Sequence, residues 1–120
     1  MESEIKREEK NKKIRKEKKK LKTIFKKVPD EKQKLVEKLV DNAAYLAIEL
    51  DELREHILLN GIREEYKNGE NQYGYKESVE NKTYKDYIKQ YTTIIKQLND
   101  MLPQGEKINP DDEFENFGCD

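Results

Sequence analysis

Two segments of this chain carry apolar residues at alternating spacings of four and three, and this periodicity limits the fold more than any other feature. The first series is Leu39, Ala43, Leu46, Leu50, Leu53 and Ile57. The second series is Tyr84, Ile88, Tyr91, Ile95, Leu98 and Leu102. Because an α-helix has about 3.6 residues per turn, such spacing gathers the apolar side chains into one stripe. The sequence therefore predicts two long amphipathic helices.

The ends of both helices carry recognisable start and stop signals. Pro29 precedes two carboxylates and favours the first turn of a helix, and Gly61 permits the left-handed conformation that ends one. Ser78 is a good N-cap for the second helix, and Pro103 stops it. Helices of similar length favour antiparallel pairing. We therefore predict an all-α fold built on a long antiparallel helical hairpin.

The connection between these helices, residues 61–77, is long for a simple helical hairpin. Asn68-Gly69 is a strong signal for a tight turn. Apolar and aromatic residues that could flank a short β-hairpin lie on both sides of it: Ile62, Tyr66, Tyr73 and Tyr75. We expect a structured linker, and we interpret its tyrosines as a plug over a helix end rather than as a contact surface.

The composition favours helices with narrow buried stripes, because 42% of the residues are charged and only 33% are hydrophobic. A core of this size is thin, so self-association is expected. The formal net charge of −1 hides a strong segregation. Residues 1–27 hold 13 Lys/Arg against 5 Asp/Glu, whereas residues 103–120 hold 1 against 6. We divide the chain into a basic N-terminal helix (1–28), a helical-hairpin oligomerisation domain (29–102, linker 61–78) and a flexible acidic tail (103–120).

The basic N-terminal segment, residues 1–28, is the strongest functional signal. A thin apolar stripe at Ile14, Leu21, Phe25 and Val28 predicts a helix that frays at its start and docks near residues 21–28. Its candidate nucleic-acid-binding residues are Lys12, Lys13, Arg15, Lys16, Lys18, Lys19, Lys20, Lys22, Lys26 and Lys27. Cations at this density can bind phosphates without regard to sequence. The alternative is a solvated extension whose field is damped by the nearby glutamates.

Two further helix faces have no obvious partner. The apolar arc over residues 35–47 is broader than one partner helix needs, so we expect it to meet the N-terminal helix, a neighbouring subunit, or some of each. The candidate oligomerisation residues are Leu35, Val36, Leu39, Val40, Ala43 and Ala47. On the second helix Lys82, Lys85, Lys89 and Lys96 share the polar side. These lysines form either a solvated face or a phosphate-facing stripe.

Groups that could perform catalysis do not converge in this sequence. His56 is the only histidine and is expected to be exposed, and Cys119 lies among acids that would raise its pKa. No phosphate-binding glycine loop and no zinc-ligand cluster is present. We expect no catalytic residue, no metal, no cofactor and no small-molecule substrate. In the acidic tail, Phe114 and Phe117 are candidate docking residues for a basic partner. The alternatives are a tail that folds back on the basic N-terminal segment and a tail that only aids solubility.

No apolar run in the sequence approaches the length of a membrane span, and the N-terminus lacks a hydrophobic segment of the signal-peptide type. We expect a soluble intracellular protein without membrane contact.

The linker contains the stretch Tyr66-Lys67-Asn68-Gly69-Glu70-Asn71-Gln72-Tyr73-Gly74, followed by Lys76, Ser78 and the helix over residues 84–103. In these residues the sequence resembles small terminase subunits of tailed bacteriophages. The helix over residues 34–60 fits the same pattern more loosely, so the resemblance covers about seventy central residues. It implies a non-catalytic, ring-forming subunit of a DNA-packaging motor that binds viral DNA and regulates the large terminase subunit. It also implies location in the cytoplasm of the bacterial host.

The N-terminal region departs from many members of that family. They carry an N-terminal helix-turn-helix domain, and residues 1–27 lack the apolar residues that would bury two short helices. DNA contact is therefore expected to be mainly with phosphates. The alternative function is a coiled-coil adaptor or scaffold that binds protein partners only.

Overall fold

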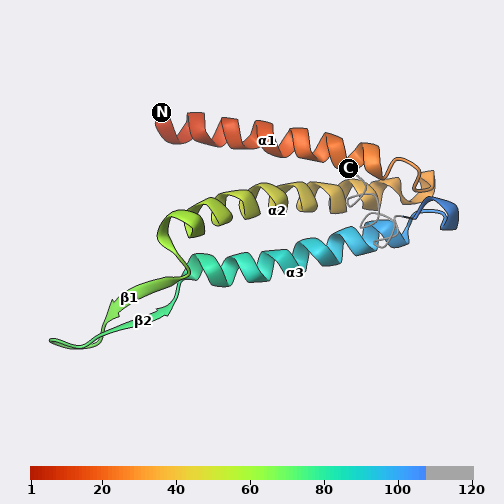
Figure 1. Ribbon diagram of the computed structural model, residues 1–120. Helices are drawn as coiled ribbons and strands as arrows, with labels where there is room; N and C mark the ends of the chain where they lie inside the picture. The colour runs from red at the N-terminus through yellow and green to blue at the C-terminus, as the bar shows by residue number, and fades with distance from the viewer. Residues whose placement is uncertain (108–120) are drawn as a thin grey trace, which may run out of the picture.

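The structure, a computed structural model, describes residues 1–107 and forms three α-helices and one β-hairpin within them (Figure 1). In chain order the elements are α1 (Glu2–Ile24), α2 (Gln33–Asn60), β1 (Arg63–Lys67), β2 (Tyr73–Glu77) and α3 (Val79–Asp100). Short 3-10 turns precede α2 and follow α3, at Asp30–Lys32 and Gln104–Glu106. The prediction of a mostly helical fold with a structured β-hairpin linker is confirmed.

Helix α2 lies between the other two and packs against both of them (Figure 1). Helix α1 runs antiparallel to α2, since Lys10 near its start pairs with Glu52 whereas Lys22 near its end pairs with Glu37. Helix α3 returns along the other side of α2 after the β-hairpin. The predicted helical hairpin is therefore present, and the N-terminal helix is its third member.

The core is concentrated where α1 ends, α2 begins and α3 ends. Its buried residues are Leu21, Phe25, Val28, Val36, Val40, Ala43, Ala44, Leu98 and Leu102. Each large aliphatic or aromatic side chain fully buried in this way contributes on the order of 1.5–3 kcal/mol. The expected docking at residues 21–28 is confirmed, because Leu21, Phe25 and Val28 are at most 4% exposed. Residues 1–28 thus share one core with the helical hairpin formed by α2 and α3.

The start of α1 differs from the expected frayed end, since the helix begins at Glu2. Two contributions account for its continuity. Glu2 and Glu4 place negative charge in the first turn, which the helix dipole favours. Lys10 then ties this half of the helix to two glutamates of α2.

The junction between the β-hairpin and α3 is fixed by a small polar cluster. The hydroxyl of Ser78, which is 4% exposed, accepts a hydrogen bond from the backbone N–H of Asn81 at 3.1 Å. The side-chain amide of Asn81 donates to Glu77 at 2.6 Å, and Lys85 pairs with the same carboxylate oxygen at 2.6 Å. The predicted N-cap at Ser78 is confirmed, and Glu77 extends it into the hairpin.

Strands β1 and β2 form an isolated antiparallel hairpin that projects away from the helices (Figure 1), hereafter called the arm (residues 62–78). The register pairs Arg63 with Glu77 and Lys67 with Tyr73. The prediction that the linker tyrosines cover a helix end is wrong, because Tyr66, Tyr73 and Tyr75 are 41%, 65% and 71% exposed. They lie on the arm and cover no helix end. Because β1 and β2 are five-residue strands that extend away from the helices, they hold these tyrosines beyond the helix ends.

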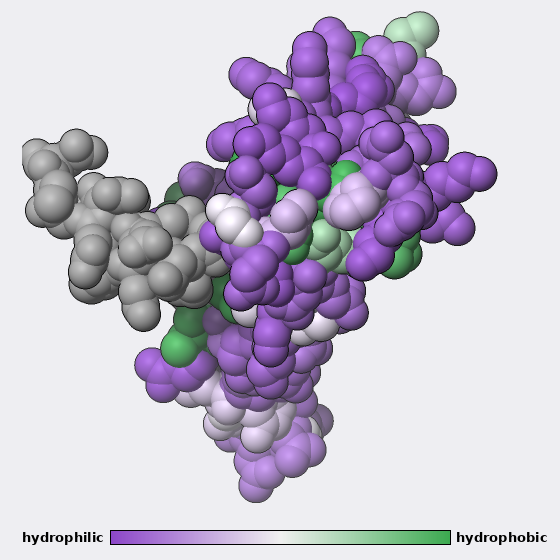
Figure 2. All heavy atoms as spheres, turned by 90° about the vertical axis from the view of Figure 1, so that its right-hand side faces the viewer, coloured by the Kyte–Doolittle hydropathy of each residue, from purple (hydrophilic) through white to green (hydrophobic). Residues whose placement is uncertain are grey.

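The surface over the core end is mostly hydrophilic. Figure 2 looks onto this end, and narrow apolar strips lie between helices whose outer faces carry polar residues. Helix α1, in the upper part of this view, is almost entirely hydrophilic on its outer side. The start of the predicted flexible tail forms the 3-10 turn after α3, where Glu106 pairs with Lys27 at 3.1 Å. Phe114, Phe117 and Cys119 lie outside the described residues.

Candidate nucleic-acid interface

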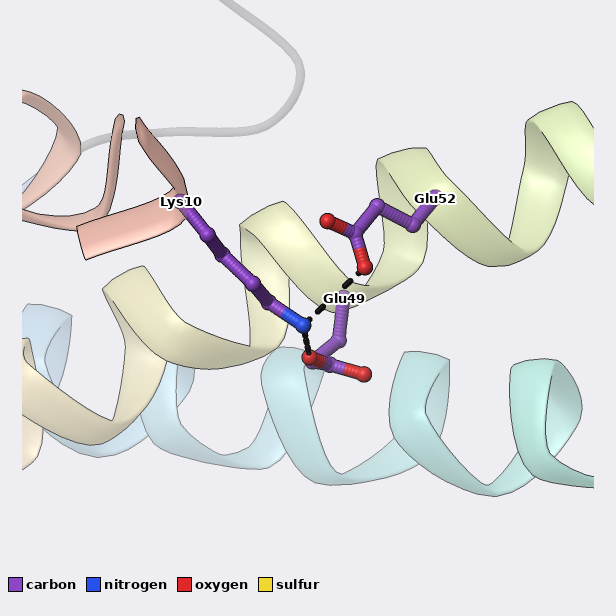
Figure 3. Close-up of polar contacts among 3 residues, drawn as sticks. All are labelled: Lys10, Glu49 and Glu52. Atoms are coloured by element: carbon purple, nitrogen blue, oxygen red, sulfur yellow. Dashed lines mark hydrogen bonds and ion pairs between the residues drawn. The ribbon is translucent and has the colours of Figure 1, made fainter. Parts of the chain in front are cut away.

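Ion pairs along one side of α1 attach this helix to α2. Lys10 bonds to Glu49 and to Glu52, the second contact at 3.0 Å (Figure 3). Two turns further on, Lys18 lies 3.6 Å from Asp41, and Lys22 lies 3.4 Å from Glu37. Together with Leu21 and Phe25, these contacts determine which face of α1 meets α2.

Lys10 anchors the first half of α1 to α2, and its side chain is 30% exposed. Burial alone would lower the pKa of Lys10, but hydrogen bonds from its ammonium group to Glu49 and Glu52, and the charges of those carboxylates, raise it overall. The ammonium group therefore stays charged through the neutral range. Sequence reasoning missed Lys10 as an anchor, because the charge pattern did not reveal that two acids of another helix would lie beside it.

The opposite face of α1 points away from α2 and is basic. At 100° per residue, Lys12, Lys16 and Lys19 lie within about 40° of the direction opposite Leu21. Arg15 flanks them on one side. On the other side, Lys13 and Lys20 border an open groove that they line together with Ile48 and Asp51 of α2. All six are exposed, and none has an ion-pair partner among residues 1–107. From Lys12 to Lys20 this basic face runs about 12 Å along the helix.

The structure divides the ten predicted nucleic-acid-binding residues into two groups. Lys18, Lys22 and Lys27 are engaged with Asp41, Glu37 and Glu106. The other seven, the six on α1 and Lys26, are exposed without such a partner in the described part of the chain. The ion-paired cations orient the helix, and the remaining ones form a surface.

Helix α3 carries a second, weaker basic stripe. Lys82, Lys89 and Lys96 are exposed on the side away from α2, but Lys85 is held by Glu77 at 2.6 Å. This side of α3 also carries Asp86 and Asp100 near its edge. The positive charge on α3 is therefore less concentrated than on α1.

The predicted oligomerisation residues lie mostly inside the chain. Val36, Val40 and Ala43 are at most 2% exposed within the shared core, and Leu39 and Ala47 are partly buried. These three residues belong to the core that the N-terminal segment, through Leu21, Phe25 and Val28, shares with Leu98 and Leu102. Leu35 is the exception at 50% exposed, beside an open groove that it shares with Leu39, Gln97, Asp100 and Met101.

The arm places cations over aromatic rings, which sequence reasoning did not foresee. The guanidinium of Arg63 lies 5.7 Å from the ring centre of Tyr75, and the ammonium of Lys67 lies 5.8 Å from that of Tyr73. On the other face, Tyr66 lies across Gly74, where an added Cβ would be 2.9 Å from the ring. Cation–π contacts at exposed sites contribute roughly 0.5–1 kcal/mol. A prediction of the strand register would have revealed these contacts, because the register places the cations of β1 beside the tyrosines of β2.

His56 lies partly exposed near the end of α2, and its Nε2 is 3.5 Å from a carboxylate oxygen of Glu80. No group of three or more His, Cys, Asp or Glu residues that could hold a metal ion occurs in residues 1–107. Within the same range, every helix is too short or too polar to cross a membrane.

No protein-family model, no curated protein and no solved structure matches this chain.

Proposed function

We propose that this chain is a non-catalytic DNA-binding assembly protein whose outward face of α1 contacts the phosphate backbone. One observation carries the proposal: α1 is attached to α2 through one side, while the cations of its other side have no ion-pair partners among the described residues. A solvated, disordered extension would not need such anchoring. The anchored helix holds its charges at fixed spacing, which lowers the entropic cost of binding a regular array of phosphates.

Binding of this kind is driven by release of counterions from the nucleic acid. Each phosphate neutralised makes the slope of log affinity against log salt more negative by about 0.9 for duplex DNA. A basic face about 12 Å long covers the axial rise of about three to four base pairs. Five of the six cations on this face are lysines, which contact phosphates as point charges, so the expected mode is mainly phosphate contact.

More specifically, we propose the role of a phage terminase small subunit. The supporting observation is that residues of the arm and of α3 resemble this family, namely residues 66–74, Lys76, Ser78 and residues 84–103. In this role the protein binds viral DNA as a homo-oligomer and regulates the large terminase subunit. The acidic tail with Phe114 and Phe117 would contact that subunit.

The arm supports a second candidate, an adaptor that binds proteins only. Its three tyrosines are exposed, and its residues 62–78 carry three cations against four carboxylates, which gives no attraction for phosphates. Aromatic residues of this kind are enriched at protein interfaces. DNA binding separates the two candidates.

The test uses the full chain and a fluorescent DNA duplex in an anisotropy titration at several salt concentrations. The variant Lys12→Gln/Lys16→Gln/Lys19→Gln removes three charges of the basic face and retains helix propensity. The matched control Lys82→Gln/Lys89→Gln/Lys96→Gln removes three charges from α3. We expect the α1 variant to weaken binding and to reduce the salt slope by about one unit for each phosphate that it no longer neutralises.

The control is expected to retain most of the wild-type affinity and slope. Equal losses of affinity in both variants would mean that only net charge matters and would remove the specific role of α1. Absence of DNA binding by the wild-type protein at low salt would overturn the proposal in favour of the protein-only adaptor.

A further inference from the structure

The arm has two unpaired strand edges. Its sheet has only two strands, and the backbone N–H groups of Ser78 and Asn68 donate to Ile62 and Gln72. Because inward and outward backbone groups alternate along an antiparallel strand, these bonds direct the N–H and C=O groups of Tyr73, Tyr75 and Glu77 away from β1. No backbone hydrogen bond to them from elsewhere in residues 1–107 is present. An isolated two-stranded hairpin is marginally stable in water and gains from a further strand.

From these observations we propose that the outer edge of β2 pairs antiparallel with the same edge of a second copy of this chain. The pairing is centred on Tyr75, which lies opposite Tyr75 of the second copy. Tyr73 then lies opposite Glu77 of the second copy, and Glu77 opposite its Tyr73. All three pairs use outward backbone groups, so up to six inter-chain hydrogen bonds form. This inference is independent of nucleic-acid binding.

Side chains on one face of the arm reinforce this pairing. Tyr73 and Tyr75 point to the same face, since they are two residues apart in a strand. In the paired arrangement the two copies bring four tyrosines together on one continuous surface. Aromatic cross-strand pairs are among the stabilising ones, and these rings are 65% and 71% exposed in the single chain. Self-pairing thus gives the two most exposed aromatic residues of the arm a partner.

Charge distinguishes the edge of β2 from the edge of β1. Full-length self-pairing of β1 would be centred on Glu65, with Glu65 opposite its own copy. Arg63 would then lie opposite Lys67 of the second copy, and Lys67 opposite its Arg63. Like charges directly opposite one another destabilise a sheet. The β2 pairing contains no like-charged pair, because Gly74 lies opposite Lys76 and Tyr73 opposite Glu77.

The width of the molecule excludes the antiparallel pairing of β2 with β1 of another copy. In that antiparallel arrangement both arms point in the same direction, so the helical bodies lie side by side. Adjacent strands are about 4.8 Å apart, and a two-stranded arm therefore allows about 10 Å per copy. The smallest extent of the molecule is 30 Å. Pairing of β2 with β2 points the two arms in opposite directions and places the bodies at opposite ends.

An apolar cluster at the base of the arm lies where the second copy would reach. Leu58, Leu59, Ile62 and Val79 are 54–77% exposed there. In the proposed register the turn of one arm extends past Glu77 of the other, to the level of this base. The interface is nevertheless small compared with the roughly 1,200–2,000 Å² of standard interfaces, so a reversible dimer is expected.

Sedimentation of the full chain over a concentration series tests the proposal. Tyr75→Pro removes the outward N–H at the centre of the pairing and leaves the bonds between β1 and β2 in place. The matched control Glu65→Pro removes the corresponding outward N–H on β1. We expect the β2 variant to weaken association by about tenfold to a hundredfold, since two hydrogen bonds per dimer are removed, and the β1 variant to associate as the wild type does.

A charge exchange at the centre tests the register and does not depend on proline. Tyr75→Lys and Tyr75→Glu are each expected to be monomeric, because each places like charges opposite one another. An equimolar mixture of the two is expected to recover dimers. Circular dichroism checks that every variant keeps its helices. The proposal is overturned by a monomeric wild type at all concentrations, by equal effects of the two proline variants, or by a mixture that stays monomeric.

Discussion

The two ends of this molecule use their apolar residues in opposite ways. At the core end, Phe25, Val28 and Leu102, which follow α1 and α3, close over α2 and are at most 4% exposed. At the arm end, Leu59, Val79 and Tyr75 are 62–77% exposed. Three helices converge at the first end, whereas α1 does not cover the last turns of α2 at the second. The comparison shows that a third helix determines whether an apolar stripe becomes core or remains available for contact.

The largest expected effect comes from truncating a core side chain. Phe25→Ala leaves a cavity where a ring 1% exposed packs in the shared core, and it should lower the free energy of unfolding by about 3–5 kcal/mol. Leu59→Ala at the arm end, where the side chain is 77% exposed, should change it by less than about 0.5 kcal/mol. Urea denaturation followed by circular dichroism measures both. Equal losses of stability would contradict the contrast between the two ends.

A smaller effect is expected at the junction between the arm and the helices. Ser78→Ala removes the hydroxyl that accepts from the Asn81 N–H, and removal of such an N-cap costs about 1 kcal/mol. Ser3→Ala in the first turn of α1 is the matched control, since α1 has no side-chain cap bond. Thermal melts of the two variants give the comparison. A Ser78→Ala variant that melts with the wild type would show that the packing of α3 on α2, not its cap, fixes the start of α3.

The smallest expected effect is a pH dependence at the same junction. Hydrogen bonds from Lys85, then from Asn81, lower the pKa of Glu77 from its usual value of 4.5. Because the folded-state pKa lies below the unfolded value, this contribution is complete above 4.5 and is lost as the pH falls through the lowered pKa. Wild type and Glu77→Gln should therefore differ slightly in Tm at neutral pH and converge in acid.

Glu65→Gln is the control for that experiment, since Glu65 has no ion pair in residues 1–107. Its Tm should differ from that of the wild type by a similar amount at every pH. A difference between wild type and Glu77→Gln that persists unchanged into acid would show that the carboxylate charge of Glu77 does not stabilise the junction.

The amino-acid sequence by itself determined the helices, their ends and the arm. Leu39–Ile57 and Tyr84–Leu102 set two helical stripes, Gly61 and Ser78 set where they end and begin, and Asn68-Gly69 set the turn of the hairpin. These features are local: spacing, caps and turn chemistry act within a few residues. The docking of Leu21–Val28 was also predictable, because its stripe is the only apolar one in the basic region.

Tertiary structure alone decided which of the charged and aromatic residues are left for function. Helical spacing from Leu21 places Lys12 and Lys16 on the outer side of α1, but the ion pairs of Lys18 and Lys22 depend on acids of another helix. The same holds for Val36 and Val40, which lie in the core shared by all three helices, and for the tyrosines that the arm exposes. These outcomes depend on contacts with residues distant in sequence, and the local spacing of residues does not reveal those contacts.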